Sequence, residues 1–216
     1  METQHHGFVW EDNIKRTIFG LTEDEIRAST YTAKHDIPAI VNRRDAGVNV
    51  SIKTTATTKV DMADALRIYD AISTEQIHVI VLQWRQASPT TKQLQQVIEL
   101  NLTNATTELF GTITVAELTA LRALIIGIPH GRHATIEEKA AYTALKKGLE
   151  AKGGQIRLHP KIDSKSQRRL QCSFNWATFA TRFPDRVVSR GAADGKFRDA
   201  TITTTVESGV RQFRAK

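Results

Sequence analysis

An acid and a lysine bracket the stretch of this chain whose residue types could carry out metal-assisted chemistry. Asp36 opens one apolar run, and Lys53 closes a second run 17 positions later. Strands at 37–42 and 47–54, joined by a tight turn that contains a glycine, would bring the two side chains together at one end of a β-hairpin. A carboxylate beside an amine can hold a hard divalent cation, activate a water molecule and face a phosphodiester.

The second predicted strand offers two further groups beside Lys53. Ser51 shares its face of the strand, because side chains alternate between the two faces, and the backbone carbonyl of Ile52 lies between them. Mg2+ needs only one or two carboxylates, with water and phosphate oxygens completing its coordination. Asp36 and the Ile52 carbonyl are therefore predicted metal ligands, and Lys53 is predicted to orient the attacking water or to stabilise charge on the phosphate.

The order of these residues resembles the PD-(D/E)XK nuclease superfamily, which includes most type II restriction enzymes, mismatch-repair nicking enzymes and Holliday junction resolvases. The resemblance covers residues 7–84 and lies in the order of the elements and in a handful of residues. His35-Asp36 stands where the family usually has Pro-Asp, and Ser51-Ile52-Lys53 stands where it has Glu/Asp-x-Lys. The serine departs from this pattern, so a second metal-binding carboxylate should come from elsewhere.

The resemblance points to Glu11 as that second carboxylate, because many relatives carry an acid on a first helix that faces the site. Glu25 is the other candidate. It stands three residues after Thr22, however, and this spacing is typical of a capping box at a helix start. Asp45 falls in the predicted turn, at the far end of the hairpin. Glu11 and Asp36 are thus the predicted metal-binding acids, with Ser51 in the second ligand position.

Hydrophobic spacing predicts the elements that must position these residues. The expected fold is α/β, a restriction-endonuclease-like mixed central β-sheet flanked by helices, with a helical and β-ribbon recognition part. The catalytic core would span 1–110 and the recognition and DNA-binding part 111–216, or the two would form one continuous domain. Helices are expected at 7–19, 60–72, 90–102, 115–126 and 136–152, and a buried strand at 77–84.

The positive charge of the chain gathers in its C-terminal part. The formal net charge is +7, and the residues from Arg157 onward hold 13 Lys and Arg against 5 Asp and Glu, whereas residues 1–156 hold 17 against 18. Strands at 155–159 and 168–174 would form a ribbon narrow enough to enter a DNA major groove. A solvated hairpin edge protected by charge is the alternative. The predicted DNA-binding residues are Arg157, Lys161, Lys165, Gln167, Arg168 and Arg169.

Composition narrows the function classes. The single cysteine, Cys172, excludes internal disulfides and cysteine-rich zinc sites, and a reducing, cytoplasmic compartment is expected. No apolar run is long enough to span a membrane, and no phosphate loop or dinucleotide fingerprint occurs. The resemblance and the charge together predict a Mg2+-dependent endonuclease of double-stranded DNA, most similar to type II restriction enzymes.

Cutting both strands of a palindrome favours a homodimer, although some small relatives act as monomers. Two other functions remain open. A structure-selective or repair nuclease would share the acidic site, and a catalytically inert nucleic-acid-binding protein would need only the basic part.

Overall fold

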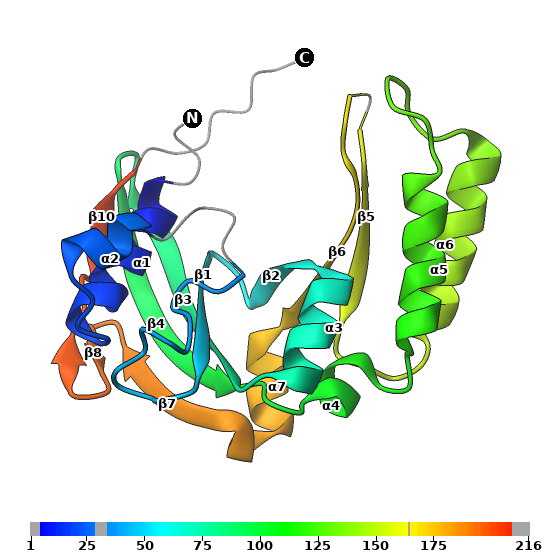
Figure 1. Cartoon of the computed structure of the whole chain (residues 1–216). Coiled ribbons are helices and arrows are strands. Elements are labelled where there is room, and N and C mark those ends of the chain that lie inside the picture. The colour runs from blue at the N-terminus through cyan, green and yellow to red at the C-terminus, as the bar shows by residue number, and fades with distance from the viewer. Residues whose placement is uncertain (1–4, 29–33, 164, 209–216) are drawn as a thin grey trace. The chain divides into compact units, whose positions relative to one another are not determined.

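The computed structural model describes residues 5–28, 34–163 and 165–208 (Figure 1). The chain has mixed α/β structure and divides into two compact units, each assembled from separated stretches of chain. The chain enters unit 2 twice, and it returns to unit 1 for the last time within helix α7 (Trp176–Arg182). Unit 1 comprises Met1–Thr58, Gln76–Leu102 and Ala180–Lys216, and unit 2 comprises Lys59–Glu75 and Thr103–Phe179.

Unit 1 is built on a five-stranded mixed sheet. Strand β1 runs parallel to β3, and β3 forms a long antiparallel hairpin with β4 across a two-residue turn at Pro89 and Thr90. On its other side β4 pairs with β10 at one end and with β7 at the other. The strands are β1 (Asn49–Thr55), β3 (Ile77–Ser88), β4 (Thr91–Asn101), β7 (Val187–Ala192) and β10 (Thr205–Glu207), with a small separate hairpin of β8 (Lys196–Phe197) and β9 (Ala200–Thr201).

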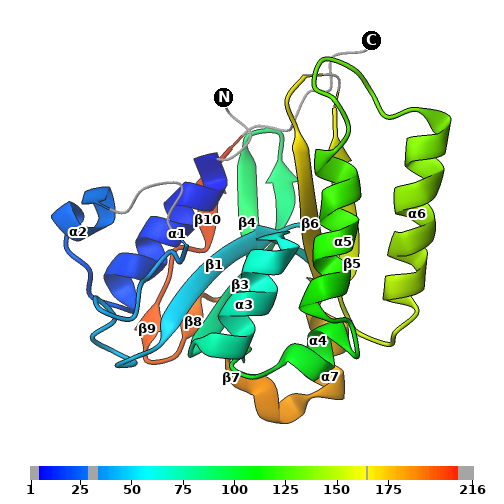
Figure 2. The same cartoon turned by 45° about the vertical axis from the view of Figure 1, so that its right-hand side comes forward.

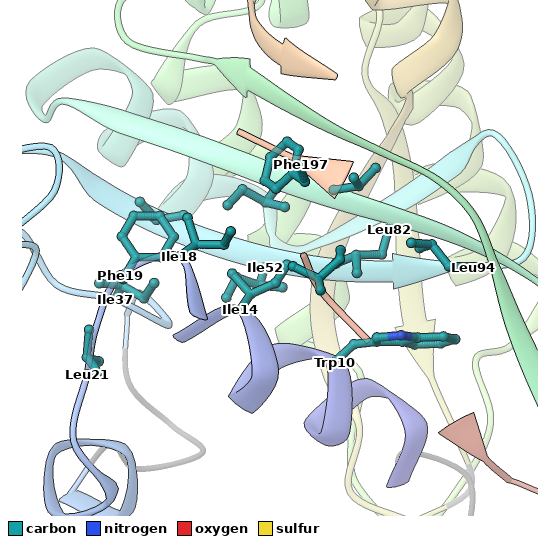
Figure 3. Packing of buried hydrophobic residues seen from close by; sticks show 14 of the residues in the cluster. Trp10, Ile14, Ile18, Phe19, Leu21, Ile37, Ile52, Leu82, Leu94 and Phe197 are labelled. Atoms are coloured by element: carbon teal, nitrogen blue, oxygen red, sulfur yellow. The ribbon is translucent and has the colours of Figure 1, made fainter. Parts of the chain in front are cut away.

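Helix α1 (His5–Thr17) covers one face of this sheet (Figure 3). Trp10 and Ile14 lie one helical turn apart, so they share a face, and both are fully buried together with Ile52 and Leu82 from the sheet. The C-terminal segment of the chain completes the same core with Phe197. Unit 1 also contains the short helix α2 (Glu23–Ala28).

Unit 2 combines a three-stranded antiparallel sheet with several helices. The strand order is β2 (Lys59–Asp64), β6 (Arg168–Asn175) and β5 (Arg157–Ile162). Helix α5 packs against the β5–β6 ribbon, and α6 packs against α5 (Figures 1 and 2). The helices are α3 (Ala65–Thr74), α4 (Thr106–Phe110), α5 (Val115–Ile126) and α6 (Ile136–Glu150). None of the helices in the described ranges has the length and apolar character needed to cross a bilayer.

Several predicted elements are confirmed. The opening helix, the strand beginning at Ile77, the helices α5 and α6 and the β5–β6 ribbon all form where the sequence places them, within a few residues at their ends. Helix α6 begins with the expected cap, because the Thr135 side chain accepts a hydrogen bond from the backbone N–H of Glu138. A capping box also starts α5, formed by Thr114 and Glu117.

Three predictions of secondary structure are wrong. The stretch predicted as a helix at 90–102 is strand β4, and the stretch at 60–72 begins as strand β2 before it turns into helix α3. The predicted hairpin partner at 37–42 is not a strand. Only Ile37 pairs with β1, through a single antiparallel bridge to Val50, and a turn follows.

Candidate active site at the edge of strand β1

The bridge between Ile37 and Val50 fixes the start of the site. The Ile37 N–H donates to the Val50 carbonyl at 3.0 Å, and the Val50 N–H donates to the Ile37 carbonyl at 2.9 Å. Since Val50 bonds away from β3, Ile52 also presents its N–H and carbonyl on the open edge of β1. The Asp36 carboxylate lies at this edge, where its Oδ2 accepts the Ile52 N–H at 2.6 Å.

Lys53 completes the edge contact. Its Nζ donates to Asp36 Oδ2 at 3.0 Å and to the Ile52 carbonyl at 3.1 Å. The Asp36 and Lys53 side chains are 24% and 29% exposed, so both can be reached from solvent. The sheet holds the backbone of Lys53, and the bridge at Ile37 holds the residue next to Asp36. The structure therefore places Asp36 beside Lys53, as the sequence predicts, and a single bridge achieves this instead of a hairpin.

Glu11 reaches the same electrostatic environment from helix α1. Its Oε1 accepts a hydrogen bond from Lys15 Nζ at 2.5 Å, one helical turn away. Burial raises the pKa of Glu11, and the charge of Asp36 raises this pKa further, against the lowering effects of Lys15 and Lys53. A cation bound between two such carboxylates would relieve their repulsion.

The alternative acid, Glu25, is engaged elsewhere. Its carboxylate accepts the Thr22 N–H at 2.8 Å, and its own N–H donates to the Thr22 hydroxyl, which completes the capping box at the start of α2. Arg43 also binds this carboxylate. The hydrogen bonds from Arg43 and Thr22 lower the pKa of Glu25 to about 2, so this acid serves the helix start.

Ser51 and Asp45 lie apart from the edge contacts. Ser51 is buried within β1, where it stands opposite Val79 of β3, and its side chain points to the other face of the strand from Ile52. Asp45 accepts a hydrogen bond from Arg198 at 2.9 Å. Neither side chain makes a described contact with the Asp36 carboxylate.

The oxygen atoms at this edge are of the kind that Mg2+ takes as ligands. Across the described ranges, no three or more His, Cys, Asp or Glu side chains gather into a group that could hold a metal ion. The edge offers the Asp36 carboxylate and the Ile52 carbonyl as oxygen ligands. The Glu11 carboxylate is close enough for the charge of Asp36 to raise its pKa. Mg2+ is bound through one or two carboxylates and takes its remaining ligands from water and phosphate, so this set is sufficient for it.

A buried charge network in unit 1 was missed by the sequence analysis. Glu99 on β4 is fully buried, and Arg198 donates to it through Nε at 2.8 Å and also through Nη2. His78 Nδ1 lies 2.8 Å from the same carboxylate, and Arg198 also binds Asp45. Burial favours the neutral acid, but the hydrogen bonds from His78 and Arg198 outweigh it and hold the pKa of Glu99 below its ordinary value.

This network fixes the loop that leads from Asp36 into β1. Asp45 belongs to that loop, and its neighbour Arg44 binds Asp199, which follows Arg198 in the chain. Two adjacent ion pairs therefore hold the loop to the C-terminal part of unit 1. The loop supplies the acid in one pair and the arginine in the other. The sequence did not indicate a role for Glu99, because the residues around it have helical spacing. A buried acid on a paired strand was therefore not expected.

The predicted DNA-binding residues lie on unit 2, and one of them is used internally. Arg168 donates all five of its N–H groups to backbone carbonyls, so none remains to offer to a base edge. We assign it a structural role in place of the predicted DNA contact. The five acceptors are the carbonyls of Ile128, Pro129, Arg132, Asp163 and Gln167.

Replacing Arg168 with alanine is expected to lower the stability of the protein by about 1–3 kcal/mol, because several carbonyls lose their donors together. Arg168→Lys should not restore the loss, since a lysine cannot reproduce the fork of N–H groups. Urea denaturation measures the effect. Arg169→Ala is the matched control, because Arg169 is exposed and adjacent. Equal stability of the two alanine variants would contradict the structural role.

The other ribbon residues remain available to a ligand. Their side chains are exposed, and within the part of the chain that the structure describes the Arg157 guanidinium donates only to the neighbouring carbonyl of Ile156, at 3.0 Å. They are Arg157, Lys161, Lys165, Gln167 and Arg169.

Comparison with known proteins adds no relative. No family model, no curated protein and no solved structure matches the chain.

Proposed function

We propose that this chain is a Mg2+-dependent endonuclease that hydrolyses phosphodiester bonds of double-stranded DNA. The observation that carries the proposal is the position of the Lys53 ammonium, which bridges the Asp36 carboxylate and the Ile52 carbonyl on an open strand edge. Both oxygens are ordinary Mg2+ ligands, and the Glu11 carboxylate lies within their electrostatic reach.

The roles of the residues follow from their contacts. Asp36 and the Ile52 carbonyl would hold Mg2+, with Glu11 as the second carboxylate. When bound, Mg2+ supplies charge stabilisation at the phosphate and lowers the pKa of a coordinated water. Lys53 would then exchange its two present contacts for a phosphate oxygen or for the attacking water, which it can donate to from the same strand position.

Site-specific cleavage of the type II restriction kind is the form of this activity that the basic ribbon supports. Exposed arginine and lysine side chains on a two-stranded ribbon suit contact with a DNA groove and its phosphates. Cleavage of both strands of a palindrome favours a homodimer, in which each copy cuts one strand. Unit 1 would carry the catalytic site, and unit 2 would contribute DNA contacts.

The test is incubation of the purified protein with unmethylated plasmid DNA and Mg2+, beside Asp36→Ala and Lys53→Ala. Discrete fragments from the wild type alone are expected. Cleavage restricted to junctions or flaps would instead identify a structure-selective or repair nuclease. If the wild type binds DNA but cuts no substrate with Mg2+ or Mn2+, the chain is a nucleic-acid-binding protein without catalytic activity.

A further inference from the structure

The β2–β6–β5 sheet of unit 2 has one apolar and one polar face. Leu158, Leu170 and Phe174 are buried on the first face. Strand register places the intervening residues together on the other face, because residues that pair across strands point the same way. The polar face carries Arg157, His159 and Lys161 from β5, Arg169, Gln171, Ser173 and Asn175 from β6, and Lys59, Asp61 and Asp64 from β2.

Two like charges stand directly opposite each other on this face. Lys161 pairs with Arg169 across the β5–β6 ribbon, an arrangement that destabilises a sheet unless an anion lies between the two side chains. In the described part of the chain, no carboxylate forms an ion pair with either of them. The contrast with other arginines is clear, since Arg16, Arg43 and Arg132 each bind a glutamate.

His159 marks the centre of a wider positive region. Its Nε2 lies 2.7 Å from the hydroxyl of Ser173, which is fully buried. Burial lowers the pKa of His159, and the charges of Lys59, Lys161 and Lys146 lower it further, with Asp61 acting in the opposite direction. Ammonium groups from β2, β5 and α6 therefore all act on one imidazole. Two of these lysines are also paired with acids, Lys59 with Asp61 at 3.5 Å and Lys146 with Glu150 at 3.6 Å, and ion pairs at partly exposed positions such as these contribute little to stability.

We propose that this polar face is a phosphate-contact surface for the backbone of duplex DNA, with Lys59, Lys146 and Lys161 as its main contacts. Ammonium groups are compact point charges that neutralise phosphates without reading bases. Lys146 and Lys59 were not among the residues expected to bind DNA from the sequence, and the fold brings them beside the ribbon. The inference rests on the proposed function for the identity of the polyanion and does not depend on catalysis.

The experiment measures binding in an Asp36→Ala background, so that the DNA stays intact. Fluorescence anisotropy with two labelled duplexes of unrelated sequence gives the affinity over a range of KCl concentrations. Lys161→Ala and Lys146→Ala are each expected to weaken binding about three- to tenfold for both duplexes, and to reduce the slope of log K against log salt by about one. Lys147→Ala is the matched control, because Lys147 is the exposed neighbour of Lys146 on the same helix.

Two results would contradict the proposed phosphate contacts. One is that Lys161→Ala and Lys146→Ala have the same affinities and salt slopes as Lys147→Ala. The other is that the Asp36→Ala protein does not bind duplex DNA at all. Loss of affinity for only one duplex, with an unchanged slope, would show that these residues read bases. The proposed cleavage is tested separately. If the wild type cuts DNA and the lysine variants bind DNA normally, only the proposed phosphate-contact surface is rejected. If the lysine variants bind DNA more weakly and the wild type cuts no DNA, only the proposed nuclease activity is rejected.

Discussion

Glu11→Gln is expected to reduce Mg2+-dependent DNA cleavage by a factor of about 100 or more while leaving DNA affinity unchanged. The substitution keeps the shape of the side chain and its ability to accept a hydrogen bond from Lys15, but it removes the negative charge that the proposed site needs. Cleavage rates on a defined plasmid and anisotropy with a labelled duplex in Ca2+ measure the two quantities separately.

The control for this variant is Glu25→Gln. Glu25 belongs to the capping box of α2 and to the ion pair with Arg43, so its replacement should leave the cleavage rate close to that of the wild type. Full activity of Glu11→Gln together with loss of activity in Glu25→Gln would move the second metal ligand to α2. Full activity of both would leave Asp36 as the only acid of the proposed site.

The raised pKa of Glu11 allows a second test of the proposed metal site. Because burial and Asp36 raise this pKa in the folded protein, the folded state binds more protons than the unfolded state, and the stability of the metal-free protein falls as the pH rises through the raised value. A cation bound between the acids should remove that loss. Thermal unfolding with and without Mg2+ should therefore diverge as the pH increases, and in Glu11→Gln this pH dependence should be reduced.

Glu99→Ala is expected to destabilise unit 1 by about 3–5 kcal/mol, because it leaves the Arg198 guanidinium buried without its main partner. The Glu99 side chain is fully buried, and only 9% of the Arg198 side chain is exposed, so water cannot replace the lost contact. Urea denaturation at neutral pH measures the loss. In the wild type, the contribution of Glu99 should disappear as the pH falls below about 4.5, since its folded pKa is lowered from that value.

The neighbouring ion pair supplies the matched control. Asp199→Ala removes the partner of Arg44, but the Asp199 side chain is 75% exposed, so a change of about 0–1 kcal/mol is expected. Replacing Glu99 and Arg198 together by leucine and methionine should recover much of the stability lost in Glu99→Ala, because the buried guanidinium is then removed with its partner. Asp45 also loses its bond to Arg198, but its side chain is 27% exposed and can be solvated. A small effect of Glu99→Ala alone would show that the network is not essential to the fold.

Some helices and strands could be predicted from the sequence alone, because their residue pattern is typical of the structure that they form. Helix α6 has a cap at Thr135 and lysines in its last turns, and the first half of β3 is apolar and rich in β-branched residues, so both were predictable. Strand β4 was not, because its buried stretch is covered on both faces and Leu94, Val97 and Ile98 imitate helical spacing. Its pairing with β3, β7 and β10 determines its conformation, and two of these partners, β7 and β10, are distant in the sequence.

The stretch from Lys59 to Thr74 mixes two periods. Val60 and Met62 alternate as in a strand, whereas Ala65, Ile68 and Ile72 follow helical spacing. The boundary was readable at Asp64, whose carboxylate caps α3 by accepting the Arg67 N–H at 3.0 Å.

The meeting of Asp36 and Lys53 could be predicted, but the reason for it could not. A hairpin was expected, whereas the turn after Pro38 is organised by Asn42, whose side chain accepts two backbone N–H groups and donates to the Val48 carbonyl. Two separate contacts, the Ile37–Val50 bridge and the Asp36 bond to Ile52, then bring the acid to the strand edge.

The division into two units has a consequence for biosynthesis, because the ribosome makes the chain from its N-terminal end. Every segment of unit 2 has emerged by Phe179, whereas unit 1 still lacks Phe197 and strands β7 and β10. Until they arrive, one side of β4 presents unpaired backbone groups, which is the state in which nascent sheets aggregate. A chain truncated after Phe179 should therefore yield insoluble product, even though all segments of unit 2 are present.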